Sequence, residues 1–397
     1  MLLADGTQTE RSVTHNGAVI CWSVQLPVNL RPPAQSPPGH SFGLDLMRAT
    51  AVLLVLTSHW AGHFGHWLDV RVPAIMETLG DTGVEIFFAL SGFLIGRILI
   101  GIAESNPGWH DFCVFLIRRA MRTLPLYFLW LFILLCIFPP QQDALVTAMR
   151  FLTLSQNLIA EMPANYYFAV TWSLAIEEWF YLLFGATLIL LARWLGGARA
   201  LPFCLAIFML APLVLRLAYM ERGLLVFFRI DEIAYGVLMA RLYQDGNAIF
   251  RYPLALLAAG LALLAAALFN ELPIPAEFAV PLTSNAEVLG GALCLPAALR
   301  LSKAASWFER PVRWIAGRSY ALYLIHMTIL VDIAEVQLFQ AGRLPALACA
   351  ILAITLPFLL ADVSYRFLES PILRRRPRQE KTSAASALPR GVVAATG

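Results

Sequence analysis

The chain has 397 residues, of which 59% are hydrophobic and only 14% are charged, with a formal net charge of +3 at pH 7. Soluble domains usually carry about a quarter charged residues. The composition therefore excludes an ordinary soluble enzyme, and the small net charge excludes a nucleic-acid-binding protein. It predicts a protein whose main solvent is the lipid bilayer.

Apolar segments recur along the chain from Leu44 onward, each close to the ~20 residues that a helix needs to cross ~30 Å of hydrocarbon. They predict an all-α, polytopic membrane bundle of about ten transmembrane helices. We expect one membrane domain over residues 41–372. The segments centre near Val52, Leu94, Leu131, Leu182, Ile207, Leu238, Leu263, Leu293, Leu324 and Leu352.

The two ends of the chain are polar. Residues 1–40 are Pro-rich and lack the basic start of a signal peptide, which predicts a loosely ordered cytoplasmic extension. Residues 373–397 begin basic and become Ser/Ala-rich, which predicts a disordered cytoplasmic tail. Arginines concentrate in alternate loops, and cytoplasmic loops retain Lys and Arg. We therefore expect a multi-pass protein of the inner (plasma) membrane with both termini in the cytoplasm.

Two ionisable residues stand out in the first segment. Arg48 and His59 lie eleven positions apart, which places them on nearly the same helix face and about three turns, or ~16 Å, from each other. A neutral imidazole can take a proton from an alcohol that attacks a thioester, so His59 is the candidate general base. Arg48 could anchor the donor or steady the site electrostatically. The alternative is a snorkelling arginine and a polar histidine at a helix end.

The segment LDLMRATAVLLVLTSHW, Leu44 to Trp60, resembles the signature of the acyltransferase-3 family of integral membrane O-acyltransferases: Arg or Lys, ten residues, then His. The resemblance implies that His59 is catalytic with Arg48 as its partner. Asp81 stands where the family commonly has Gly, and the N-terminal extension is longer than usual. Further motifs resemble the family at 81–97, 118–127, 171–184, 229–240, 317–326 and 363–372.

Arg119 and Arg122 form an Arg-x-x-Arg pattern on one face of the expected third span. Two guanidinium groups there suit the phosphates of coenzyme A arriving from the cytoplasm, and with Arg118 they form the predicted donor site. The alternative is an ordinary cluster of positive charges beside a membrane. The expected donor is acyl-CoA, with acetyl-CoA as the default, and no metal is expected.

Two adjacent carboxylates, Glu177 and Glu178, open the fourth span. We favour Glu177, which could orient the imidazole of His59 or hold the acceptor hydroxyl; the alternative is a pairing with a buried arginine. We expect Ser91 to serve helix packing and Arg229 to pair with Asp231. The remaining candidates are Glu85, Trp172, Ser173, Glu178 and His326, the last interpreted as a buried structural histidine or, alternatively, a second functional one.

The sequence thus predicts a membrane O-acyltransferase that moves an acyl group from cytoplasmic acyl-CoA to a hydroxyl of a carbohydrate or glycosylated acceptor. A lipopolysaccharide or an exopolysaccharide is among the possible acceptors. A metal enzyme is one alternative, because His59, His63 and His66 are close in sequence. A transporter or flippase of a glycan or lipid-linked sugar is another, since intramembrane charges also line substrate pathways. Neither the acceptor nor the oligomeric state follows from the sequence.

Overall fold

The computed structural model describes residues 41–105, 108–140, 143–158, 167–219, 223–272 and 274–377. Within these ranges every regular element is a helix. This confirms the predicted all-α class. The predicted N-terminal extension, residues 1–40, and the predicted tail beyond residue 377 lie outside the described residues.

Eight helices of the described chain are long and apolar enough to cross a membrane. The chain is therefore a multi-pass membrane protein, and a helix of about 20 residues suffices for each crossing. They are α1 (Phe42–Leu68), α2 (Ala74–Ser105), α3 (Trp109–Ile137), α5 (Thr171–Leu195), α6 (Gly197–Tyr219), α10 (Ala276–Arg300), α11 (Ser306–Met327) continued by the π-helix η2 (Thr328–Phe339), and α12 (Ala346–Ser364) continued by the π-helix η3 (Tyr365–Glu369) and α13 (Ser370–Arg374).

The other two predicted segments are also helical but shorter. One is divided into α7 (Val226–Arg229) and α8 (Asp231–Gln244), with a break at Ile230. The other is α9 (Pro253–Leu268), whose 16 residues fall short of a full crossing. All ten predicted segments therefore coincide with helices, and eight of them have the length of a span. The remaining short helices are α4 (Ala144–Leu152) and η1 (Ala248–Arg251).

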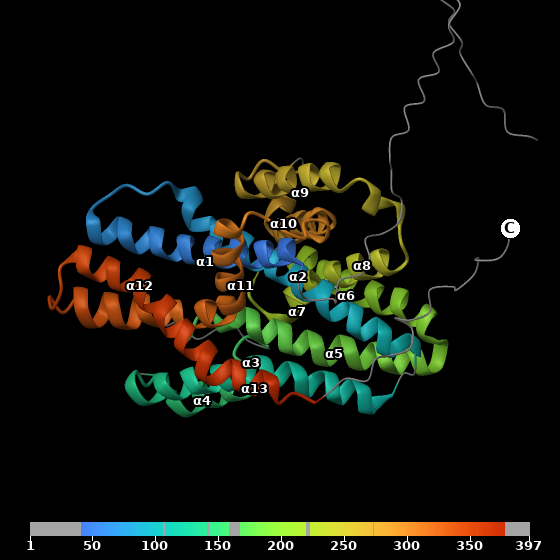
Figure 1. Ribbon diagram of the computed structural model, residues 1–397, viewed down its shortest axis with the longest axis horizontal. Helices are drawn as coiled ribbons and strands as arrows, with labels where there is room; N and C mark the ends of the chain where they lie inside the picture. The colour runs from blue at the N-terminus through green and yellow to red at the C-terminus, as the bar shows by residue number, and fades with distance from the viewer. Residues whose placement is uncertain are drawn as a thin grey trace, which may run out of the picture. The chain divides into compact units, whose positions relative to one another are not determined.

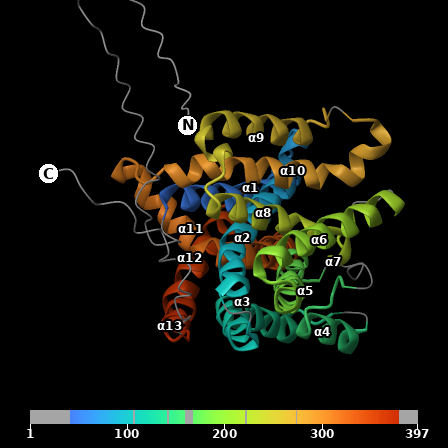
Figure 2. The same ribbon diagram turned by 90° about the vertical axis from the view of Figure 1, so that its right-hand side faces the viewer.

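Helix α2 occupies the centre of the bundle and packs against α1, α5, α6, α8 and α10. Figures 1 and 2 show α9 and α10 on one side of it and α3, α4 and α13 on the other. Glycines permit its closest contact. A Cβ at Gly92 would lie 1.9 Å from the carbonyl oxygen of Ile233, and one at Gly236 would lie 2.2 Å from that of Ala89. The backbones of α2 and α8 therefore touch, as small residues allow in membrane bundles.

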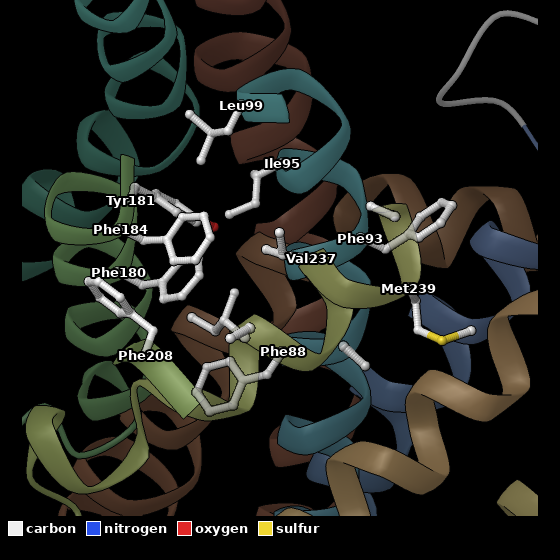
Figure 3. Packing of buried hydrophobic residues seen from close by; sticks show 14 of the residues in the cluster. Phe88, Phe93, Ile95, Leu99, Phe180, Tyr181, Phe184, Phe208, Val237 and Met239 are labelled. Atoms are coloured by element: carbon white, nitrogen blue, oxygen red, sulfur yellow. The ribbon is translucent and has the colours of Figure 1, made fainter. Parts of the chain in front are cut away.

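An aromatic core fixes α5 against α2. The rings of Phe180 and Phe184 stack with centroids 4.7 Å apart, and Phe208 of α6 packs edge-on against both. Figure 3 shows these rings facing Ile95 and Leu99 of α2. The packing sets the position of the amino-terminal half of α5, which carries several of the predicted site residues.

Candidate active site

Two histidines from distant parts of the sequence meet, one from the carboxyl-terminal half of α1 and one from the carboxyl end of α11. Nδ1 of His59 lies 2.9 Å from Nε2 of His326. His326 is fully buried, and its Nδ1 lies 2.8 Å from the carbonyl oxygen of Tyr323 and 3.1 Å from that of Leu322. His59 is partly exposed. The structure thus joins the predicted base to a residue that was expected to be a buried histidine.

This contact follows from the way α1 and α11 run together. At the other end of the same helices, Arg313 donates to Asp45 across 3.0 Å. The two residues are 268 positions apart, and the two histidines are 267 apart. Nearly equal separations mean that the helices run parallel and in register over nearly four turns.

The other histidines of α1 do not converge with His59 on a common point. Nδ1 of His63 lies 3.0 Å from the backbone oxygen of His59, and the ring of His66 packs edge-on against Phe339. Among the described residues, no group of three or more His, Cys, Asp or Glu side chains is arranged to hold a metal ion.

Asp81 of α2 is a neighbour of the histidine pair that the sequence analysis noted only as a departure from the family pattern. Its carboxylate interacts electrostatically with His59 and with Arg229. The hydrogen bond from Ser58 Oγ to the carbonyl oxygen of Glu77, 2.5 Å long, fixes α2 against α1 nearby. An ionisable residue within an apolar helix was the available signal, because such a group is costly in a membrane unless it interacts.

The amino-terminal turn of α5 lies beside the histidine pair. Ser173 Oγ is 2.7 Å from the hydroxyl of Tyr323, which in turn donates to the carbonyl oxygen of Val170 at 3.0 Å. The guanidinium of Arg229 lies 4.5 Å from the ring centre of Trp172. Ser173 and Trp172 therefore connect the pair to a second group of charges.

That second group, the paired-charge cluster, joins five residues that are at most 1% exposed: Glu85, Arg216, Arg229, Asp231 and Glu232. Arg216 donates two hydrogen bonds to Asp231, of 2.8 and 2.6 Å, and Arg229 donates to Glu85 and, at 2.9 Å, to Glu232. The expected pairing of Arg229 with Asp231 is wrong. Residues two apart on a helix face different directions, whereas residues three apart share a face.

A third group, called here the arginine level, consists of Arg48 on α1 and of Arg119 and Arg122 on α3. Arg48 is about three turns from His59 along α1. Arg48 donates to Asp45 at 3.1 Å, and Arg119 and Arg122 are close enough to repel it electrostatically. The guanidinium of Arg119 lies over the rings of Tyr181 and Phe115, at 5.5 and 5.9 Å. Within the described chain, neither Arg119 nor Arg122 forms an ion pair.

The carboxylates of α5 also lie at the arginine level. Glu177 accepts a hydrogen bond of 3.1 Å from Tyr181, whose hydroxyl is 2.7 Å from Ser91 Oγ. It interacts electrostatically with Arg119 and Arg122. Glu178 accepts from Thr123 at 2.7 Å. The structure therefore brings Glu177 to the arginines and gives the ring of His59 a different partner, His326.

Arg118, the third predicted donor ligand, behaves differently from its neighbours. Its guanidinium donates to the carbonyl oxygen of Pro377, near the end of the described chain. Its role is thus partly to hold the segment after α13 against α3. Only two of the three predicted donor arginines keep their guanidinium groups free of hydrogen bonds among the residues that the structure describes.

Comparison with known proteins identifies relatives of this chain. The chain is 27% identical over 366 residues to YrhL of Bacillus subtilis (strain 168), covering 83% of this chain and 54% of the relative. It is 26% identical to the peptidoglycan O-acetyltransferase OatA of Listeria monocytogenes, covering 83% and 55%, and 26% identical to the O-acetyltransferase OatA of Staphylococcus aureus, covering 84% and 57%. The chain thus spans about half the length of these relatives. No solved structure matches it.

A family model described as "Acyltransferase domain" matches residues 41–362. The match covers most of the described chain, from the first residue before α1 to α12, and it includes the histidine pair, the paired-charge cluster and the arginine level. Six of the seven motifs on which the sequence resemblance depended lie within it, and the seventh, at 363–372, begins directly after it. This chain therefore belongs to the acyltransferase-3 family of membrane proteins.

Proposed function

We propose that this chain is a membrane O-acyltransferase that moves an acyl group, acetyl by default, from acyl-CoA to a hydroxyl of a carbohydrate acceptor. The observation that supports this most is the placement of a partly exposed histidine, His59, about three turns along α1 from a level where Arg119 and Arg122 of α3 form no ion pair among the described residues. The names of the Listeria and Staphylococcus relatives describe O-acetyl transfer, and the Listeria name specifies peptidoglycan. These names support an acetyl donor and a glycan acceptor.

The donor would bind at the arginine level. Guanidinium groups without carboxylate partners are well shaped for the phosphates of coenzyme A. Arg48 and His59 are separated by eleven residues, or ~16 Å at 1.5 Å per residue. An extended pantetheine arm is of comparable length, so its thioester would lie at His59 while its nucleotide stays with the arginines.

The chemistry would require one base. His59 takes the proton of the acceptor hydroxyl while the oxygen attacks the thioester carbonyl, which forms the new C–O bond. The C–S bond then breaks, and the proton passes from His59 to the departing thiolate to give free coenzyme A. The imidazole returns to its neutral state, and such base catalysis is typically worth about 10²- to 10⁴-fold in rate.

The proposed orientation places this reaction across the bilayer of the plasma membrane. With both termini in the cytoplasm, the arginine level faces the compartment that contains acyl-CoA. The histidine pair, about three turns further along α1, then lies toward the opposite face. An acceptor glycan outside the cell would meet the acyl group there.

The test uses purified protein in lipid nanodiscs with acetyl-CoA labelled in its acetyl group and glycan fragments as acceptors. We expect transfer of label to the glycan, reduced at least about 100-fold by His59→Ala. His110→Ala, at an exposed histidine near the start of α3, is the matched control and should keep full activity. Full activity of folded His59→Ala would refute the role of the base, and movement of glycan across vesicles without acyl-CoA would indicate a flippase.

A further inference from the structure

We propose that His326 is a positioning residue that holds His59 in the tautomer whose proton is on Nδ1, so that Nε2 is the atom that accepts the acceptor's proton. This inference rests on the proposed function of His59 as the base. It names which ring nitrogen acts, and it assigns a role to a buried histidine that the proposed mechanism does not otherwise use.

The backbone determines the protonation of His326. Its Nδ1 lies within hydrogen-bond distance of two carbonyl oxygens, those of Tyr323 and Leu322, at 2.8 and 3.1 Å. A carbonyl oxygen can only accept, so the proton of a neutral His326 must be on Nδ1. Its Nε2 is then a bare acceptor.

The tautomer of His59 follows from the next hydrogen bond. Nδ1 of His59 is 2.9 Å from that bare Nε2, and a hydrogen bond between them requires one proton. Nδ1 of His59 must therefore donate. In a neutral imidazole one nitrogen carries the proton and the other is an acceptor, so Nε2 of His59 presents its lone pair away from His326.

Burial divides the roles of the two rings. His326 is 0% exposed and is held on one side by its own helix and on the other by His59, so it cannot contact a substrate. His59 is partly exposed. The buried ring therefore orients and the partly exposed ring reacts, as in hydrolase triads where a buried group fixes the tautomer of the catalytic histidine.

The other groups around His59 are compatible with this arrangement. The backbone of Val55, one turn earlier on α1, is a further hydrogen-bond partner of the His59 ring, and its carbonyl oxygen can only accept. On α1, the ring of His63 hydrogen-bonds the backbone oxygen of His59 and not the ring nitrogens of His59. On α2, the carboxylate of Asp81 interacts with His59 electrostatically and would favour the imidazolium that forms during the reaction. When Nε2 accepts a proton, the bond from Nδ1 to His326 becomes charge-assisted and strengthens.

The first experiment measures the tautomer directly. The full-length protein is labelled with ¹⁵N at its histidine rings, and the His59 signals are assigned by their loss in His59→Gln. Nitrogen chemical shifts should show a protonated Nδ1 and a bare Nε2 in the wild type, and this pattern should become mixed in His326→Leu. A wild-type His59 protonated on Nε2 would overturn the inference, whatever the activity.

The second experiment uses a pair of variants that differ in one acceptor atom. The amide oxygen of glutamine can occupy the place of Nε2 and accept from His59, whereas leucine offers no acceptor. His326→Leu should lower kcat at least about tenfold with the KM for acyl-CoA unchanged, and His326→Gln should recover much of that loss. Equal activity of the two variants, or a kcat of the leucine variant within about twofold of wild type, would overturn the role of the acceptor.

Failure of the positioning role of His326 can be told apart from failure of the proposed function. Folding of each variant is followed by its elution and thermal unfolding in the same detergent, and the tautomer of folded His326→Leu is read by NMR even if it is inactive. An active His59→Ala would refute the proposed function. An inactive His59→Ala beside a fully active His326→Leu would leave that function in place and refute only the positioning role.

Discussion

The paired-charge cluster and the arginine level place the same kind of side chain in one bundle with opposite surroundings. Arg216 and Arg229 each meet carboxylates that satisfy their guanidinium groups. Arg119 instead lies against aromatic rings, and Arg122 has no ion pair among the described residues. A carboxylate partner together with complete burial thus distinguishes an arginine that holds helices together from a half-buried one that can receive a ligand.

The difference has an energetic basis. A buried ion pair contributes little net stability, but removal of one partner leaves an uncompensated charge and costs about 3–5 kcal/mol. The cluster links four elements, because Glu85 is on α2, Arg216 on α6, Arg229 on α7 and Asp231 on α8. An arginine without a carboxylate partner makes no such link, and its loss should affect binding more than folding.

The largest effect is expected from Arg216→Met. It would leave Asp231 buried without its bidentate partner and should lower the free energy of unfolding by about 3–5 kcal/mol. Chemical unfolding in detergent measures this loss. Arg241→Met is the control, because Arg241 pairs with Glu104 and Asp245 at 28% exposure and should cost only about 0–1 kcal/mol. Equal losses for the two variants would remove the distinction between buried and exposed pairs.

The next effect concerns the donor. Arg119→Ala and Arg122→Ala should each raise the KM for acyl-CoA about 10- to 100-fold, since a hydrogen bond to a charged group contributes about 1.5–3 kcal/mol. The free energy of unfolding should change little. Arg118→Ala, which removes a contact with Pro377, should raise this KM less. A loss of stability with an unchanged KM would show that the arginine level supports the fold and would move the donor site elsewhere.

A smaller effect should separate guanidinium shape from charge. Arg119→Lys retains the charge but loses the planar fork and much of the stacking on Tyr181 and Phe115. We expect its KM for acyl-CoA to lie between those of the wild type and Arg119→Ala. Steady-state kinetics with acetyl-CoA measures this, and a lysine variant as poor as the alanine variant would mean that charge alone contributes nothing there.

The smallest effect is expected at Glu177. Its carboxylate interacts with Arg119 and Arg122, so Glu177→Gln should make the arginine level more positive and lower the KM for acyl-CoA by about two- to fivefold. The value of kcat should stay the same. A large fall in kcat would instead give Glu177 the catalytic role that the sequence analysis favoured.

Much of the fold could be predicted from the sequence, because apolar segments of the length of a membrane span are a strong signal. The break at Ile230 and the π-helix over Thr328–Phe339 could not be predicted. Both depend on contacts between helices that have no periodic trace in the sequence. The length of α9 was also hidden, since its apolar composition matches that of a full span although it has 16 residues.

The site was predictable where its residues share one helix. The spacing of Arg48 and His59 places them on one face without any knowledge of their neighbours. The contact of His59 with His326, 267 positions away, depends on how α1 and α11 pack, and no local pattern contains that information. For the same reason the sequence alone could not decide between His59 and a buried arginine as the neighbour of Glu177, and Asp81 stood out only as a departure from the family pattern.

The matched ends of α1 and α11 have a mechanical consequence. A slip of α11 by one residue would displace His326 by about 1.5 Å and turn it by about 100°, which no hydrogen bond of ordinary length survives. The salt bridge between Asp45 and Arg313 opposes such a slip. The salt bridge at one end of the helix pair therefore preserves the orientation of the His59 imidazole nearer the other end.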